Sequence, residues 1–463
     1  MSHGYTQILA DYLSALKFED IPEEVTERAK MLTMHVIGAA IAAKDTKMGM
    51  DAMDIASGSM DGGALRATVW GSGKQIAYMG AAFANGTMAD VLDWEDCSWT
   101  GHPSAGAVPA AVAAAEAMHI SGKEYLTALI GGYDVYQRIA MAVQPKYSDQ
   151  EKGYGWGLTS WQIFAAAMPV AKMFGFSGER MNQAIGMTAT LTPVPICGTH
   201  DTRSDAYHYH HGFTARDGIA GCEVVEKGIA TLQNLLECGT GYCGAVRGDE
   251  AREEWYTKDL GEKYLIMETL FKHWPANMWI QVPLDQLDDL VTHNNIKAED
   301  IESITITPNI YTRMTFHPEG FDSLVDAQFS IPYCLAMYFY EKPSAKWAAA
   351  DYLKNAELLK LASKVHTTED CERLMFPFPY FQKGSFPLYT MQIDLKDGRR
   401  FFDERRFPKG HPREPFTFEE EAELFKVMTA AAFSPEKQNR FIEFFRDLEN
   451  TGDMSVLGEI FKS

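Results

Sequence analysis

The sequence predicts a mainly α protein in which a large all-helical domain is interrupted by a smaller, inserted α+β lid domain. Helix-periodic apolar residues fill the first half of the chain, strand patterns appear after about residue 270, and helical patterns return after Pro415. The chain has 463 residues, more than one small core usually holds, so at least two domains are expected. We assign residues 1–268 and 405–463 to the helical domain and residues 269–404 to the lid.

The first half of the chain carries clear helical signals. Residues 22–24 (Pro-Glu-Glu) place a proline and two acids in a first helical turn, where the helix dipole favours negative charge. Apolar residues then recur at helical spacing over residues 25–40. Residues 109–118 and 163–173 are rich in alanine, and such small side chains let helices approach closely. These segments predict a tightly packed helical interior.

The lid carries the strand signals. Residues 301–307 alternate in a β-branched pattern typical of a strand. Residues 389–395 and 400–402 flank an Asp-Gly pair at 397–398, which predicts a hairpin because Asp-Gly tolerates positive φ. Helical patterns lie at 327–340, 345–361 and, beyond the lid, at 419–428 and from the Ser-Pro-Glu cap at 434–436 onward.

Composition excludes several classes of function. The chain holds 42 Lys+Arg against 63 Asp+Glu, a formal charge of -21, whereas nucleic acids and anionic membranes attract clustered cations. The seven cysteines are odd in number and form no CxxC pair, which favours reduced thiols. The N-terminus lacks the basic and apolar regions of a signal peptide, and the longest apolar runs are shorter than a membrane span. We therefore expect a cytoplasmic protein with no nucleic-acid or membrane partner.

One candidate site combines acids with a histidine. Asp93, Glu95 and Asp96 lie within four residues and would repel one another, which indicates either a functional cluster or a solvated acidic loop. His102, followed by Pro103, comes immediately before an alanine-rich helix. There the helix dipole would lower the pKa of the histidine and dispose it to accept a proton.

Two further segments could carry polar chemistry. Lys272 lies among aromatic residues at the boundary between the domains, either as a desolvated cation or with its stem over the aromatic rings and its ammonium in water. His208 and His210 would share one face of an extended segment, as a metal site requires, but no Cys or carboxylate completes the set. A hydrogen-bonding pocket wall is the better interpretation. No P-loop or strand-linked G-x-G-x-x-G occurs, so no nucleotide cofactor is expected.

Together these stretches resemble the MmgE/PrpD family, whose members include 2-methylcitrate dehydratase, cis-aconitate decarboxylase and iminodisuccinate epimerase. The resemblance covers most of the chain. It is clearest in NGTMADVLDWEDCSWTGHPSAGAVPAAVAAAEA, GGYDVYQRI, HHGFTARDGIAG, LFKHWPAN and DAQFSIPYCLAM. It implies a helical domain with an α+β lid, a site between the two, a homodimer, and neither a metal nor an organic cofactor.

The resemblance also assigns residues. Asp93 and His102 match the acidic and histidine positions of the first family motif, and Lys272 matches the lysine of the second. Tyr311 falls near a family tyrosine.

The chain departs from the family pattern at three places. Cys97 stands where a threonine is usual. Residues 155–160, which include Trp156, lack a second family histidine, and Tyr207 replaces a family lysine.

These features predict a cofactor-free lyase of the hydratase or dehydratase type that abstracts a proton α to a carboxylate or carbonyl of a small organic acid. Lys272 would anchor or polarise the substrate, His102 held by Asp93 would act as acid or base, and Tyr207 or His210 would supply the opposite partner. Because cations stabilise the charge that proton removal creates, the loss of two basic groups predicts a substrate bulkier or less anionic than a tricarboxylate. The expected substrate-binding residues are Cys97, Trp156, Arg203, His208, His210 and Tyr311.

Other functions remain open at this point. Epimerisation or decarboxylation would use the same proton-transfer apparatus. A catalytically lapsed relative that only binds a ligand is the alternative outside enzymology, and it is supported by the missing histidine and lysine.

Overall fold

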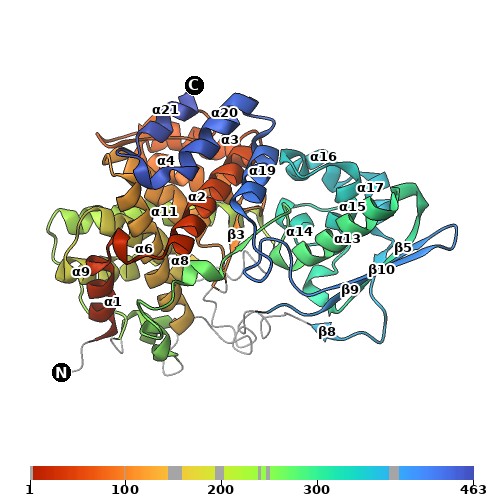
Figure 1. Cartoon of the computed structure of the whole chain (residues 1–463), viewed down its shortest axis with the longest axis horizontal. Helices are drawn as coiled ribbons and strands as arrows, with labels where there is room; N and C mark the ends of the chain where they lie inside the picture. Colours follow the sequence, from red (N-terminus) through yellow and green to blue (C-terminus); the bar gives the residue numbers. More distant parts are fainter. Residues whose placement is uncertain are drawn as a thin grey trace.

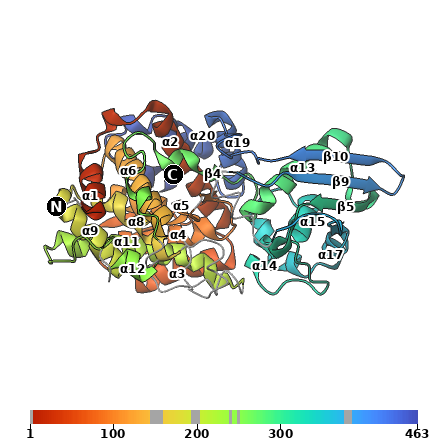
Figure 2. The ribbon, with the colours of Figure 1, turned by 90° about the horizontal axis from the view of Figure 1, so that it is seen from below.

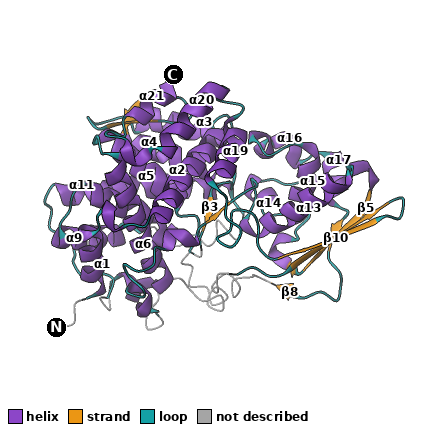
Figure 3. Cartoon of the chain, in the orientation of Figure 1, coloured by secondary structure: helices purple, strands orange, loops and turns teal. Residues whose placement is uncertain are grey.

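The chain folds into two domains that lie side by side, a larger helical domain and a smaller α+β domain (Figure 1). The structure, a computed structural model, describes residues 4–98, 100–143, 159–192, 203–237, 241–246, 251–374 and 385–462. Helices dominate, and the strands gather mainly in the smaller domain (Figure 3). The prediction of a mainly α fold with two domains is therefore confirmed.

The helical domain is built around helices that are apolar on every side. All residues of α5 (Ser104–Ala117) are buried, as is every residue of α4 (Tyr78–Asp90) except Met79. A helix without a polar face belongs in the middle of a bundle. The helices packed around these two are α1 (Tyr5–Ala15), α2 (Glu23–Ala43), α3 (Lys47–Ser59), α6 (Gly122–Val143), α8 (Thr159–Met173), α9 (Gly178–Thr190), α11 (Tyr209–Glu226) and α12 (Tyr242–Val246).

The C-terminal helices pack on this same domain (Figure 1). They are α19 (Phe418–Thr429), α20 (Pro435–Arg446) and α21 (Val456–Lys462). Phe425, Phe441 and Phe461 belong to the apolar core that also contains the N-terminal helices. His35 of α2 joins its Nδ1 to Glu421 Oε1 of α19 at 2.9 Å, and both side chains are buried. The end of the chain thus completes the core that its beginning starts.

The α+β domain packs helices against a four-stranded sheet of order β10-β9-β5-β7 (Figure 2). Its apolar core is separate from that of the helical domain. The strands are β5 (Ile301–Thr307), β6 (Asn309–Ile310), β7 (Val365–His366), β8 (Arg373–Leu374), β9 (Tyr389–Leu395) and β10 (Arg400–Arg405). The helices are α13 (Gln281–Asn294), α14 (Leu324–Gln328), α15 (Ile331–Tyr340), α16 (Ala350–Leu353) and α17 (Ala356–Ala362). The proposed boundaries at 268/269 and 404/405 stay a prediction.

The strands agree with the sequence prediction, and two helices differ from it. β5 and β9 cover the predicted residues, and the Asp-Gly pair at 397–398 forms the turn before β10. Residues 327–340 form parts of two helices because the Ser330 hydroxyl caps a new one, α15. Residues 345–361 divide in the same way, with Asn355 capping α17. The apolar periodicity predicts one continuous helix in each segment, but a short polar residue within the pattern caps a new helix and so divides the segment.

A two-stranded ribbon marks the junction between the domains. β3 (Asp96–Cys97) pairs antiparallel with β4 (Leu270–Phe271), just before the chain enters the α+β domain. Phe271 N donates to Gly410 O at 3.1 Å, where the chain returns toward the helical domain. A separate small hairpin, β1 (Arg66–Thr68) with β2 (Gln75–Ala77), lies beside α4 and α5. The ribbon therefore ties both crossings to the segment that follows α4.

Two further observations bear on the sequence expectations. Within the described ranges, no helix has both the length and the apolar character needed to cross a membrane. Five cysteines fall in those ranges, and all of them are free thiols: Cys97, Cys222, Cys243, Cys334 and Cys371.

We predict that Gly410→Ala destabilises the protein more than Gly398→Ala. Both glycines have positive φ, 88° and 89°, so each alanine should cost about 1–2 kcal/mol of backbone strain. A Cβ at Gly410 would also lie 2.0 Å from Phe271 O, whereas one at Gly398 meets open space. Overpacking should add about 1–3 kcal/mol at Gly410. Thermal unfolding of the two variants measures the difference, and equal shifts in Tm would contradict the close approach.

Candidate active site

A buried acidic segment follows α4. Asp90 ends the helix, and Asp93 and Glu95 come before β3, all with side chains removed from solvent. Asp93 has φ 49°, a left-handed conformation that is uncommon for a residue other than glycine. Such conformations cluster at functional sites. The alternative of a solvated acidic loop is wrong for this segment.

Lys272 is the cation of this cluster. Its backbone N donates to Glu95 O at 3.2 Å, which continues the β3–β4 ribbon and brings the lysine beside the acids. Its ammonium donates to Asp93 and to Glu95 Oε1 (2.9 Å), and lies 3.1 Å from His102 Nδ1. The side chain is completely buried, so the alternative with an exposed ammonium is wrong. Burial opposes the charge, but the two carboxylates outweigh it and raise the pKa of Lys272.

His102 is a neutral imidazole held by Glu95. Its Nδ1 makes a hydrogen bond with Glu95 Oε1 and lies 3.7 Å from Asp93 Oδ1, so Glu95 is the nearer partner. Burial and the charge of Lys272 lower the pKa of His102 to about 3. The position before α5 is as predicted, but these two causes, rather than the helix dipole, account for the shift. When Nδ1 carries the proton and donates a hydrogen bond to Glu95, Nε2 keeps its lone pair.

The histidines of the third segment lie on helical backbone. Tyr207 and His208 end the 3-10 helix η2 (Asp205–His208), and α11 begins directly after it. His208 and His211, three residues apart, therefore both reach Asp90, with Nδ1 2.7 Å from Oδ2 and 3.2 Å from Oδ1 respectively. Burial opposes protonation, but Asp90 raises the pKa of both histidines. His210 does not join them.

Aromatic contacts of Tyr207 connect the cluster around Lys272 with the histidines beside Asp90. The Tyr207 ring lies 6.2 Å from the ring of His102 and 6.2 Å from that of His211, each in an edge arrangement. Burial raises the pKa of Tyr207 well above its usual value, so the hydroxyl keeps its proton. His210 is only partly buried, with its ring 6.5 Å from Tyr207, and burial lowers its pKa to about 4.

Two of the predicted substrate-binding residues, Cys97 and Arg203, have polar atoms that already contact other parts of the protein. Cys97 Sγ lies 3.2 Å from Met278 Sδ, and burial raises its pKa, so it stays a thiol. Arg203 donates to Thr315 Oγ1 (2.7 Å) and pairs with Asp326. These contacts give Arg203 a clear role in fastening its segment to the α+β domain. Trp156 lies outside the described residues.

Tyr311 lies apart from the cluster, whereas Arg313, two residues later, lies on the side of the cluster. Tyr311 is 48% exposed, with Arg373 stacked 4.0 Å over its ring. Arg313 is buried, donates from Nε to Asn277 Oδ1 (2.9 Å) and lies 4.5 Å over the Phe329 ring. That ring is 6.2 Å from the Tyr207 ring. The prediction at 311 thus missed the functional candidate by two residues.

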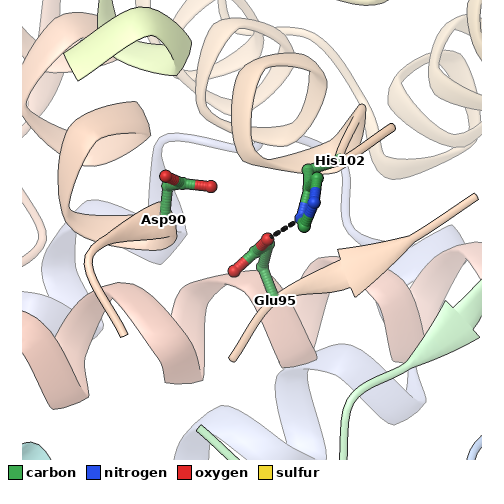
Figure 4. Close-up of side chains that lie close together, drawn as sticks. All are labelled: Asp90, Glu95 and His102. Carbon is green, nitrogen blue, oxygen red and sulfur yellow. Dashed lines mark hydrogen bonds and ion pairs between the residues drawn. The ribbon is translucent and has the colours of Figure 1, made fainter. Parts of the chain in front are cut away.

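Asp90, Glu95 and His102 could also be considered as metal ligands. One ligand atom from each lies within 4.8 Å of the others, and Figure 4 shows the side chains turned toward a common space. Two carboxylates and an imidazole suit a divalent cation. However, the Lys272 ammonium already contacts Glu95 and lies within reach of His102. The donor set therefore holds a protein cation, which a metal would have to displace.

Comparison with known proteins supplies the family. The MmgE/PrpD N-terminal domain matches residues 7–254 and the MmgE/PrpD C-terminal domain matches residues 274–450. The chain belongs to the MmgE/PrpD family. The cis-aconitate decarboxylase of Aspergillus terreus is 22% identical over 487 residues, covering 99% of this chain and 96% of the relative. The cis-aconitate decarboxylases of Homo sapiens and Mus musculus are 22% and 23% identical, covering 100% of this chain and 95% and 94% of their own lengths. The chain thus has small-acid lyases among its relatives.

The sequence predicts four catalytic residues, and the structure brings them together: Asp93, His102, Lys272 and Tyr207. Sequence reasoning missed the partnership of Glu95 with His102, the roles of Asp90 and His211, and the proximity of Arg313. One available signal was Asp90 itself, the one charged residue of a helix that is otherwise mostly apolar.

We predict that Lys272→Met lowers the free energy of unfolding by about 3–5 kcal/mol near neutral pH, because it leaves Asp93 and Glu95 buried without a counter-charge. Without the cation their pKa values should rise in the folded state, so the loss should shrink as pH falls and both become neutral. Lys30→Met is the matched control, since Lys30 is also buried but its partners Glu27 and Glu449 are 41% and 27% exposed and can rehydrate. Denaturant unfolding at several pH values tests this; equal, pH-independent losses would contradict it.

Proposed function

We propose that the protein is a cofactor-free lyase of the hydratase or dehydratase type, acting on a small organic acid by proton transfer α to a carboxylate or carbonyl. The observation that carries the proposal is the neutral imidazole of His102, held at Nδ1 by Glu95 beside the buried ammonium of Lys272. A neutral imidazole with an oriented lone pair is the usual form of a general base.

In the elimination direction, the α C–H bond breaks and its proton moves to His102 Nε2. The electron pair of that bond forms the C=C bond as the C–O bond to the β-hydroxyl breaks. The departing oxygen takes a proton from a second group and leaves as water. Tyr207, whose hydroxyl keeps its proton and whose ring lies 6.2 Å from that of His102, is the proposed donor. Hydration is the reverse.

Charge stabilisation would come from two cations. Lys272 donates to Asp93 and Glu95, and its ammonium lies 3.1 Å from His102 Nδ1, so it is enclosed by the cluster. Its contribution is therefore to hold the acids and to stabilise the negative charge that proton removal creates. Arg313, buried close to Phe329 and Tyr207, is the proposed anchor for a substrate carboxylate, because a guanidinium matches a carboxylate bidentately. This site favours a substrate with fewer carboxylates than a tricarboxylic acid.

Decarboxylation is the second candidate. It is favoured by the names of the relatives, which are cis-aconitate decarboxylases. In that reaction the bond to a carboxylate carbon breaks, CO2 leaves with its electron pair left on carbon, and an acid protonates that carbon. Tyr207, whose hydroxyl keeps its proton, would then be the donor.

We predict deuterium incorporation at the α-carbon when the protein is incubated in D2O with its substrate. The assay is NMR over a panel of mono-, di- and tricarboxylic acids, with trimethylacetate as a control because it has no α-hydrogen. His102→Asn should lower the exchange rate by about 10²–10⁴-fold, the usual contribution of a general base. Release of CO2 would favour the second candidate. Exchange retained in His102→Asn would refute the role of His102, and rapid turnover of cis-aconitate would refute the expected substrate class.

We also predict that the exchange rate rises with pH through about 7. Burial raises the pKa of Glu95 to about 7, and the ionised carboxylate, unlike the neutral acid, stabilises the imidazolium that forms when His102 takes a proton. The rate should therefore be low below this pKa and level off above it. Glu95→Gln keeps an oxygen acceptor but cannot ionise, so it should remove the inflection near pH 7. An unchanged inflection in this variant would assign the titration to another group.

A further inference from the structure

His208 and His211 each present a buried nitrogen that the described protein does not use. Both side chains are buried, at 1% exposure each, and neither Nε2 has a hydrogen-bond partner among the described residues. Buried polar atoms are nearly always paired, and an unpaired one is costly enough to need an explanation. Two such atoms on neighbouring turns of the backbone indicate a place that a ligand fills.

Asp90 orients both rings. Its Oδ2 makes a hydrogen bond with His208 Nδ1, and its Oδ1 lies 3.2 Å from His211 Nδ1 as an ion pair, so each ring directs its Nε2 away from this carboxylate. In a protonated ring both nitrogens carry a proton, so Nε2 is then an N–H donor. When Asp90, Asp93 and Glu95 are all ionised, they carry three negative charges against the one positive charge of Lys272, so protonated His208 and His211 would reduce the net negative charge of the cluster.

We propose that His208 and His211 form a carboxylate-binding subsite, in which their two Nε2–H groups bind one carboxylate of a small dicarboxylic acid. The proposal rests on the proposed function and deepens it, since it names the substrate class of the same site. Paired imidazolium donors replace the separate cations that a more anionic substrate would need. Arg313 is then available for the second carboxylate or the carbonyl.

Affinity for the anion should depend on pH. The charged and titratable groups that act on the two histidines are Asp90 on α4, Asp93, Glu95 and Asp96 on the following segment, His102 before α5, Asp205 on η2 and His210 on α11. Burial opposes protonation, but Asp90 raises the pKa of both histidines, so they hold their charge to a higher pH than an ordinary histidine and lose it as pH rises through the raised pKa. Glu95 also gains negative charge as pH rises through about 7, so variants are needed to separate the two effects.

The test compares the binding of succinate and butyrate to the full chain by calorimetry, since the two acids share a four-carbon chain and differ by one carboxylate. The double variant His208→Asn/His211→Asn keeps an amide donor for Asp90 but removes both Nε2 atoms. His119→Asn is the control: this exposed histidine has φ 57°, which asparagine tolerates, and it pairs with Asp453 instead of the site. Thermal unfolding checks that each variant is folded.

We expect the unsubstituted protein to prefer succinate by about ten-fold or more at about pH 6.5 and by less at about pH 9, as charge-assisted hydrogen bonds imply. The double variant should lose the preference and His119→Asn should keep it. A double variant that keeps the preference would overturn the proposal. So would Zn²⁺ binding that needs both histidines without any preference for succinate. If the double variant does not fold, a preference for succinate that does not change with pH in the unsubstituted protein still contradicts the subsite.

The deuterium assay separates this proposal from the proposed function. A succinate preference that depends on both histidines, without exchange on any acid, would support the subsite and refute the lyase. Exchange that depends on His102, with no preference for succinate, would refute the subsite and leave the lyase supported.

Discussion

The structure depends on one buried ammonium group. Lys272 lies where a two-stranded ribbon joins the domains, and it is enclosed by Asp93, Glu95 and His102. Burying these charges separately would be prohibitive, and together they are tolerable only because the geometry pairs every one of them. That requirement explains the left-handed backbone at Asp93, which turns its carboxylate onto the lysine. It also explains why Glu95 can bind both the ammonium and the imidazole: the ribbon places its backbone against that of Lys272. The ion pairs and the active imidazole are therefore parts of a single arrangement.

The same arrangement separates the protonation states of groups that would otherwise titrate together. Lys272 lowers the pKa of its neighbour His102, while Asp90 raises the pKa of His208 and His211 only a short distance away. Two kinds of histidine therefore coexist in one cluster, neutral beside the ammonium and protonatable beside the carboxylate. Such divergence is how one site holds a base and an acid at the same pH. The overall charge of -21 has little bearing on this, because the groups of the cluster are buried and shielded from the rest of the surface.

Local chemistry made much of the fold predictable. β5 and β9 follow from alternation, the hairpin follows from its Asp-Gly pair, and α2 follows from the acids of its first turn. The site was predictable where residue types are unusual for a core, as with Lys272 and His102. It was less predictable where a shift of one or two residues along the chain changes which side chain faces the site. His208 shares Asp90 with His211 instead of with His210 because α11 begins at Tyr209, and a helix brings positions three apart onto one face. Arg313 rather than Tyr311 lies inward for a similar reason, since the chain forms a 3-10 turn after β6. The choice of Glu95 over Asp93 as the partner of His102 depends on the ribbon, a pairing between residues far apart in sequence that no local pattern contains.

The division of labour between the domains follows from where each group is attached. The proton-transfer groups lie on the helical side or on the ribbon itself, whose backbone is fixed by close-packed helices. The α+β domain contributes Arg313 and Phe329, and it is joined to the segment after α4 through Gln328, whose side-chain amide donates to Val91 O at 2.9 Å. A change in the second domain can therefore alter what the site accepts without disturbing the ion pairs that set the protonation of His102. In the proposed mechanism, the buried ammonium sets the protonation of His102, and Arg313 across the junction contributes to the choice of substrate.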